Sequence, residues 1–150
     1  SNSLKKPRVA ERIHDSIVYN LKKKIRKNHE IKYKYVHAFS SGVGACLWAK
    51  TDTGAIISSG TILGEKGISS EEIGKRAVQE FLKYIQHEVP VDNYLSDQLI
   101  PLMAYSNEPS TIKVLEITQH ARTNMTLLKK FTPHEYKISK KNDYFLIQYL

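Results

Sequence analysis

The chain has 150 residues, of which 41% are hydrophobic and 25% charged, and this composition suits a folded core in one domain or in two small ones. Its 23 basic residues outnumber 15 acidic ones, and the formal net charge of +8 is as consistent with a polyanionic partner as with a solvated basic surface. No apolar run approaches the roughly 20 residues of a membrane span. The single cysteine, Cys46, excludes an internal disulfide and a cysteine-based zinc site, and predicts a cytoplasmic protein with one buried, inert thiol.

The first 90 residues predict two helices and three strands. In chain order, these are a helix at 8–26 and strands at 31–39, 43–51 and 55–62, followed by a helix at 69–85. Apolar residues every four positions indicate the first helix, whose end belongs to the basic run 22–27. Alternating aromatic and β-branched residues indicate the first strand, with Tyr33 and Tyr35 on one face. Ser69 and Glu72 have the spacing of a capping box and start the second helix.

Pro90 separates this region from a second one. The residue patterns there predict a helix at 92–106, a strand at 110–118, a helix at 120–131 and strands at 134–141 and 143–150. The first of these helices contains Pro101, and further basic runs occupy residues 128–130 and 137–142. Helices and strands alternate in both regions, so we expect an α/β or α+β fold with helices on sheet faces.

His120 lies where a predicted strand ends and the next helix begins. Backbone N–H groups point outward at a helix start and attract anions, and Arg122 adds a positive charge there. An unprotonated imidazole at such a place is a competent nucleophile. A polar cluster that merely caps the helix explains the same residues, so the pattern alone leaves both interpretations open.

Other residues that bear chemistry give weaker signals. Gly42 and Gly44 occur in GVGACL, which lacks the third glycine and the following helix of a nucleotide-binding loop, so a turn or bulge is favoured. The six histidines form no HxH or HExxH pair, which argues against a catalytic zinc site. Asp97 and Gln98 stand in an otherwise apolar helix, where Asp97 could cap, pair at the surface, or face a cleft and hold a ribose or a metal.

Five segments occur in the same order as in the RNA 3′-terminal phosphate cyclases, most closely those of archaea. They are KKPRVAERI, GVGACLWAKTDTG, GEKGISSEEIGKRAVQEFLKYI, VDNYLSDQLIPLMA and ITQHARTNMTLLKKFTPHEYKI. The chain from about Lys5 to Ile138 therefore resembles the C-terminal part of such a cyclase. DQLIPLMA followed by HARTN is the specific part of the match.

The resemblance implies a ligase-type enzyme of RNA processing. Its substrates would be ATP and RNA with a 3′-phosphate end. The enzyme would use ATP and a divalent metal, Mg or Mn, to convert the RNA 3′-phosphate into a 2′,3′-cyclic phosphate. His120 would attack the α-phosphate of ATP and become adenylylated. The nucleotide-binding segment would comprise Tyr94, Leu95, Ser96, Asp97 and Gln98. Within it, Tyr94 would lie against the adenine, Gln98 near the adenine or ribose, and Asp97 beside the histidine ring, the phosphates or the metal.

The family architecture is a large domain of three α/β repeats with a small α/β domain inserted in the third. Residues 4–89 resemble the inserted domain, with a mixed sheet and packed helices, and residues 90–150 resemble the remaining part of the large catalytic domain. We therefore expect the chain to be only the C-terminal portion of the enzyme and to be inactive alone. Exposed sheet edges and apolar faces would make it self-associate as a homo-oligomer or strand-exchanged dimer.

Two other functions stay open. A non-catalytic cyclase-like protein that binds RNA in ribosome assembly would share the segments, but such relatives lack the histidine, so His120 favours the enzyme. A generic basic RNA-binding module could use Tyr33 and Tyr35 between lysines. It would leave the ordered series of segments unexplained.

Overall fold

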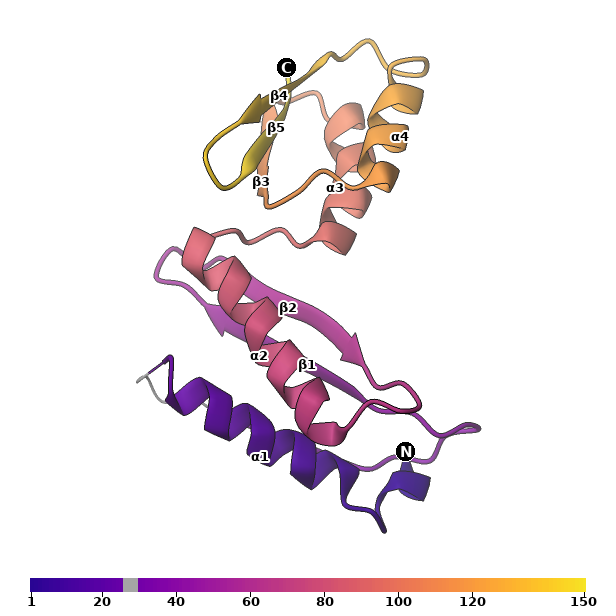
Figure 1. Cartoon of the computed structure of the whole chain (residues 1–150). Helices are drawn as coiled ribbons and strands as arrows, with labels where there is room; N and C mark the ends of the chain where they lie inside the picture. The colour runs from indigo at the N-terminus through magenta and orange to yellow at the C-terminus, as the bar shows by residue number, and fades with distance from the viewer. Residues whose placement is uncertain (26–29) are drawn as a thin grey trace. The chain divides into compact units, whose positions relative to one another are not determined.

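The computed structural model of the chain describes residues 1–25 and 30–150, which form two compact units. The N-terminal unit comprises residues 1–48 and 59–82, and the C-terminal unit comprises residues 49–58 and 83–150. The elements are η1 (Asn2–Leu4), α1 (Val9–Lys22), β1 (Gly44–Lys50), β2 (Ile56–Leu63), α2 (Ser70–His87), α3 (Asn93–Tyr105), β3 (Ser110–Val114), α4 (Gln119–Leu128), β4 (Tyr136–Lys140) and β5 (Phe145–Tyr149) (Figure 1). The predicted first helix and the basic run 22–27 extend into residues 26–29, which lie outside the described residues.

The α+β class expected from the sequence is confirmed. β1 and β2 form a two-stranded hairpin, and β3, β5 and β4 form a second sheet in that order. Both pairings within the second sheet are antiparallel, and the short connection between β1 and β2 requires the same of the hairpin. The mixed sheet expected in the first domain is therefore an antiparallel hairpin among the described residues.

α1 and α2 approach each other closely in the N-terminal unit. A Cβ atom added at Gly74 of α2 would lie 2.7 Å from the Ser16 Cβ and 2.8 Å from the Ile13 carbonyl oxygen of α1, so only glycine fits there without a shift. Arg12 donates two hydrogen bonds of 2.7 and 2.8 Å to the Glu71 carboxylate. This bidentate pair lowers the pKa of Glu71 to about 2. The contact between the two helices thus has a steric and an ionic component.

The strand predicted at 31–39 is wrong, because the described residues 30–38 contain no strand. Tyr35 instead turns its hydroxyl to α1, where it donates to Glu11 at 2.5 Å and accepts from the Ala10 N–H at 3.0 Å. Burial foremost, followed by the bond to Glu11, raises the pKa of Tyr35. The alternating pattern was compatible with a strand, but these contacts with the helix determine the local structure.

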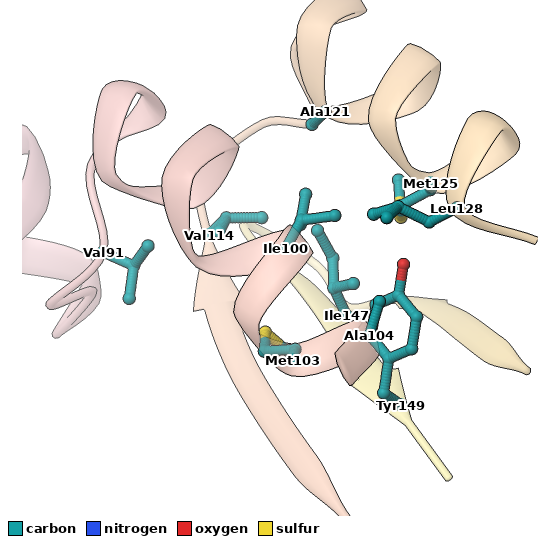
Figure 2. Packing of buried hydrophobic residues seen from close by; sticks show 10 residues of the cluster. All are labelled: Val91, Ile100, Met103, Ala104, Val114, Ala121, Met125, Leu128, Ile147 and Tyr149. Carbon is teal, nitrogen blue, oxygen red and sulfur yellow. The ribbon is translucent and has the colours of Figure 1, made fainter. Parts of the chain in front are cut away.

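The C-terminal unit is a three-stranded sheet covered by two helices. β5 is the central strand, and its fully buried Ile147 pairs with Ile112 of β3 on one side and Ile138 of β4 on the other. Helices α3 and α4 lie side by side against this sheet (Figure 1). The resulting core contains Val91, Ile100, Met103, Ala104, Val114, Ala121, Met125, Leu128, Ile147 and Tyr149 (Figure 2). The core fixes α3 and α4, which carry every site residue predicted above.

The end of α2 directs the chain toward α3. Glu88 adopts a left-handed conformation with φ of 51°, and the N–H of Val89 donates to the Tyr84 carbonyl at 3.0 Å. This is the hydrogen-bond pattern of a Schellman motif, with Glu88 where glycine is usual. Lys113 of β3 donates to the carbonyl of His87 at 2.6 Å and so satisfies another carbonyl at this helix end.

Candidate functional site

The two helices of the C-terminal unit begin with side-chain caps. Asp92 precedes α3 and accepts a 2.7 Å hydrogen bond from the Leu95 N–H. Thr118 precedes α4 and accepts a 2.9 Å hydrogen bond from the Ala121 N–H. Each cap satisfies an N–H group that has no acceptor within its own helix, which fixes where the helix starts.

His120 is the second residue of α4, within its first turn. β3 ends at Val114, four residues earlier than the predicted strand, so a short connection rather than the strand leads to His120. The His120 side chain is exposed. The structure records no hydrogen bond or ion pair for its ring among the described residues, so both imidazole nitrogens are accessible to a ligand.

Asp97 connects α3 to the start of α4 through two different groups. Its carboxylate accepts a 2.6 Å hydrogen bond from the hydroxyl of Thr118. Its backbone carbonyl accepts a 3.2 Å hydrogen bond from the side-chain amide of Asn124. Thr118 and Asn124 lie on either side of His120 in the sequence. The structure therefore places Asp97 beside the segment that carries His120, although the recorded partner of its carboxylate is Thr118.

The other four residues of the predicted nucleotide-binding segment lie on different sides of α3. Tyr94, Leu95 and Gln98 are exposed, and the Tyr94 side chain is 75% exposed. Ser96 is fully buried and donates a 2.8 Å hydrogen bond to the Asn93 carbonyl. Its hydroxyl is thus directed into the protein, whereas Tyr94, Leu95 and Gln98 are available to a ligand. The nucleotide-binding role of all five residues stays a prediction.

A shallow depression of about 290 Å³ lies along the outer face of α4. Its lining comprises Gln119, Arg122, Thr123, Thr126, Leu127 and Lys130. For neither Arg122 nor Lys130 is an ion pair recorded within the described part of the chain, so both cations can interact with an anion. Thr123 and Thr126 donate their hydroxyl protons to helix carbonyls and offer only acceptor lone pairs to a ligand.

The described residues contain no group of three or more His, Cys, Asp or Glu side chains that could hold a metal ion. The described part of the chain therefore provides no multidentate protein site for the predicted divalent metal. No helix within residues 1–25 and 30–150 is both long and apolar enough to cross a bilayer.

The structure corrects one residue-level prediction in the N-terminal unit. Cys46 on β1 is exposed, not buried as its apolar neighbours suggested. The exposed and half-buried residues of β1 alternate, and Cys46 falls on the exposed face together with Trp48. An alternating strand predicts which residues share a face, but not which face is covered.

The sequence pattern did not predict the hydrogen-bonding role of three residues at the site, Thr118, Asn124 and Pro101. Thr118 was included in the predicted strand, although threonine directly before a helical segment is a typical N-cap. Asn124, four residues after His120, has no role in the sequence pattern that singled out the histidine. Pro101 lies inside a helix and has no N–H for the Asp97 carbonyl, but the bond from Asn124 to that carbonyl depends on how α4 packs beside α3.

Residues 2–86 match the family described as the RNA 3′-terminal phosphate cyclase (RTC) insert domain. This match covers more than half of the chain, and the chain belongs to the RNA 3′-terminal phosphate cyclase family.

Archaeal proteins named RNA 3′-terminal phosphate cyclase extend the similarity beyond the insert domain. The protein of Pyrococcus furiosus is 39% identical over 102 residues, which are 68% of this chain and 29% of that protein. The protein of Methanosarcina acetivorans is 34% identical over 114 residues, or 76% and 30% of the two chains. The protein of Thermococcus gammatolerans is 31% identical over 130 residues, or 87% and 37%. The matched regions thus span about a third of the length of these curated relatives.

Proposed function

We propose that this chain carries the nucleophilic histidine of an enzyme that uses ATP to convert an RNA 3′-phosphate end into a 2′,3′-cyclic phosphate. The observation that carries the proposal is His120, which is exposed on the first turn of α4 and has no recorded hydrogen-bond partner in the described part of the chain. Membership in the cyclase family supplies the reaction class. The resemblance of the DQLIPLMA and HARTN segments supports the assignment of the residue.

The proposed chemistry divides one difficult step into three displacements at phosphorus. An unprotonated ring nitrogen of His120 forms a bond to the α-phosphorus of ATP, and pyrophosphate leaves with the electrons of the broken P–O bond. An oxygen of the RNA 3′-phosphate then attacks the same phosphorus and releases the histidine. Finally, the 2′-hydroxyl oxygen attacks the terminal RNA phosphorus, its proton passes to solvent, and AMP leaves.

The surroundings of His120 support the first displacement. Phosphoryl transfer depends mainly on positioning and on neutralising the charge of the phosphates. Arg122, two residues after His120 on α4, has no recorded ion pair among the described residues and is a cation that can interact with the phosphates. Tyr94 and Gln98 on α3 offer an aromatic face and an amide to the adenine and ribose.

The described residues do not complete the site. They offer no cluster of metal ligands, so we assign no step to a metal bound by this chain. The relatives are about three times as long as the matched region, and we infer that further groups come from a longer polypeptide. The 150-residue chain alone is therefore expected to form no cyclic end.

A cyclisation assay tests the proposal. A polypeptide of the relatives' full length that carries this chain is incubated with ATP, a divalent metal and an RNA ending in a 3′-phosphate. We expect a phosphatase-resistant cyclic end, and a loss of at least about a thousandfold in rate for His120→Ala, because the nucleophile is removed. His134→Ala is the matched control, since this histidine of the same unit lies near the chain end against the Leu150 carbonyl.

Two results would reject the proposal. The first is cyclisation at an unchanged rate by His120→Ala. The second is RNA binding without any cyclisation by the unaltered protein, which would instead support a non-catalytic cyclase-like protein.

A further inference from the structure

We propose that Thr118 is a positioning residue for His120 and that Asp97 holds it in place, with Pro101 and Asn124 completing the arrangement. These four residues are called the Asp97 junction below. The inference rests on the proposed function, because it concerns how the proposed nucleophile is presented. It assigns no contact with substrate to Thr118.

The junction originates in a proline inside α3. In a regular helix the carbonyl of Asp97 would accept the N–H of the residue four positions later, which is Pro101 and has none. The freed carbonyl accepts the side-chain amide of Asn124 from α4 at 3.2 Å instead. The proline thus costs α3 one hydrogen bond and makes an acceptor available to the neighbouring helix.

The carboxylate of Asp97 fixes the other side of His120. The Thr118 hydroxyl has one proton, which it donates to Asp97 at 2.6 Å. A lone pair of the same oxygen can then face the Ala121 N–H, which donates to it at 2.9 Å. The bond to an ionised carboxylate is the stronger of the two, so it sets the rotamer in which Thr118 caps α4.

His120 lies between these two attachment points. Thr118 is two residues before it and Asn124 four residues after it, and both are bonded to Asp97. Ala121, directly after the histidine, is fully buried against the core. The backbone of the first turn is therefore held from two sides while the imidazole projects outward. In-line attack at phosphorus is sensitive to displacements of about 1 Å, so this turn must be held in place.

Variants at Thr118 separate positioning from binding. In the full-length polypeptide, we measure the rate of labelling by α-labelled ATP and the ATP concentration that gives half the maximal rate. Thr118→Val keeps the shape and removes the hydroxyl, and should slow labelling about 10- to 100-fold at an unchanged half-maximal ATP concentration. Thr118→Ser keeps the hydroxyl and should stay within about threefold of the unaltered protein. Asn124→Ala should resemble Thr118→Val.

Two comparisons exclude a general loss of stability as the cause. Thr132→Val removes a buried hydroxyl of the same unit that donates to the Leu128 carbonyl, outside the candidate site, and should leave the labelling rate unchanged. Pro101→Ala supplies an N–H that competes with Asn124 for the Asp97 carbonyl. It should raise the melting temperature, because proline is unfavourable inside a helix, and yet lower the labelling rate. Labelling of Thr118→Val at the rate of the unaltered protein would overturn the proposal.

A second measurement on the 150-residue chain is independent of activity. Amide hydrogen exchange of Ala121 reports opening of the first turn of α4. Thr118→Val should accelerate this exchange at least tenfold without changing exchange in β5, and unchanged Ala121 exchange overturns the proposal even if labelling slows. An unaltered full-length protein that takes no label rejects the proposed function itself. The exchange result then still decides whether the Asp97 junction holds the segment around His120.

Discussion

At the scale of single residues, Tyr149 of the C-terminal core has an environment that costs stability. Its side chain is 2% exposed, and its hydroxyl has no hydrogen-bond partner among residues 1–25 and 30–150. In Figure 2 the hydroxyl points toward the side of the core that α4 covers. A buried hydroxyl without a partner keeps its desolvation penalty, and burial raises the pKa of Tyr149 to about 12.

Tyr149→Phe should therefore stabilise the C-terminal unit. We expect the free energy of unfolding at neutral pH to rise by about 1 kcal/mol, because the ring stays and the unpaired hydroxyl is removed. Urea denaturation measures the change. Tyr105→Phe is the control, since that tyrosine is 64% exposed and its hydroxyl can bond to water.

The same substitution should also change the response to alkali. The pKa of Tyr149 rises from the ordinary tyrosine value of 10.0 to about 12 in the folded chain, so folding favours the neutral phenol. Its contribution to stability is complete below pH 10 and is lost as the pH rises from about 10 to about 12. The stability difference between Tyr149→Phe and the unaltered chain should widen over that interval. A constant difference would contradict the buried, unpaired hydroxyl.

The sequence pattern located His120 but not the contacts of the residues around it. The placement of His120 at the start of a helix followed from the pattern around it, and α4 begins at Gln119. The link between Asp97 and Thr118 could not be predicted, because 21 residues separate the partners and the bond depends on how α3 packs beside α4. The burial of Ser96 was likewise not predicted, because apolar residues such as Leu95 and Leu102 also occur on the exposed side of α3, so the pattern does not identify the covered face.

At the scale of elements, Gly74 determines how closely α1 and α2 pack. Replacing a glycine inside a helix by alanine normally stabilises the helix by about 1 kcal/mol. Here the new methyl group would meet the Ile13 carbonyl oxygen at 2.8 Å. We expect Gly74→Ala to destabilise the N-terminal unit by about 1–3 kcal/mol, because the two helices must separate.

Thermal or urea unfolding of the two glycine variants tests this expectation. Gly42→Ala is the matched control, because a Cβ there meets nothing within 4 Å and the change should be almost neutral. Gly74→Ala with stability equal to or above that of the unaltered chain would contradict the close approach.

Elements with strong periodicity were predicted well, and those that depend on partners were not. The repeat of apolar residues every four positions located α1 and α2 to within a few residues. The alternation at 31–39 was equally regular, yet Tyr35 bonds to α1 and the described segment pairs with no strand. β3 ended earlier than predicted because its partner strand β5 begins at Phe145, opposite Val114. Thr118 then caps the following helix instead of extending the strand.

At the scale of the whole molecule, the chain exposes apolar side chains on α3 that a folded protein usually covers. Leu102 is 68% exposed and Tyr105 is 64% exposed, on the same helix as the exposed Tyr94 and Leu95. Exposed apolar side chains on one helix favour association. We expect the 150-residue chain to self-associate with increasing concentration.

Light scattering across a dilution series measures this association. Leu102→Glu should weaken it, because the charge would have to be desolvated in the interface. Asn107→Glu introduces the same charge in the loop after α3 and should have little effect. A monomer at every concentration would contradict the expectation and show that this surface is tolerated in water.

The most direct test of the account is to locate the covalent adduct. The full-length polypeptide is incubated with α-labelled ATP without RNA, and the labelled peptide is identified by mass spectrometry. We expect an acid-labile adenylyl group on the peptide that contains His120, none after His120→Ala, and none on the 150-residue chain incubated alone. Label on another residue, or label that persists in His120→Ala, would contradict the assignment of the nucleophile.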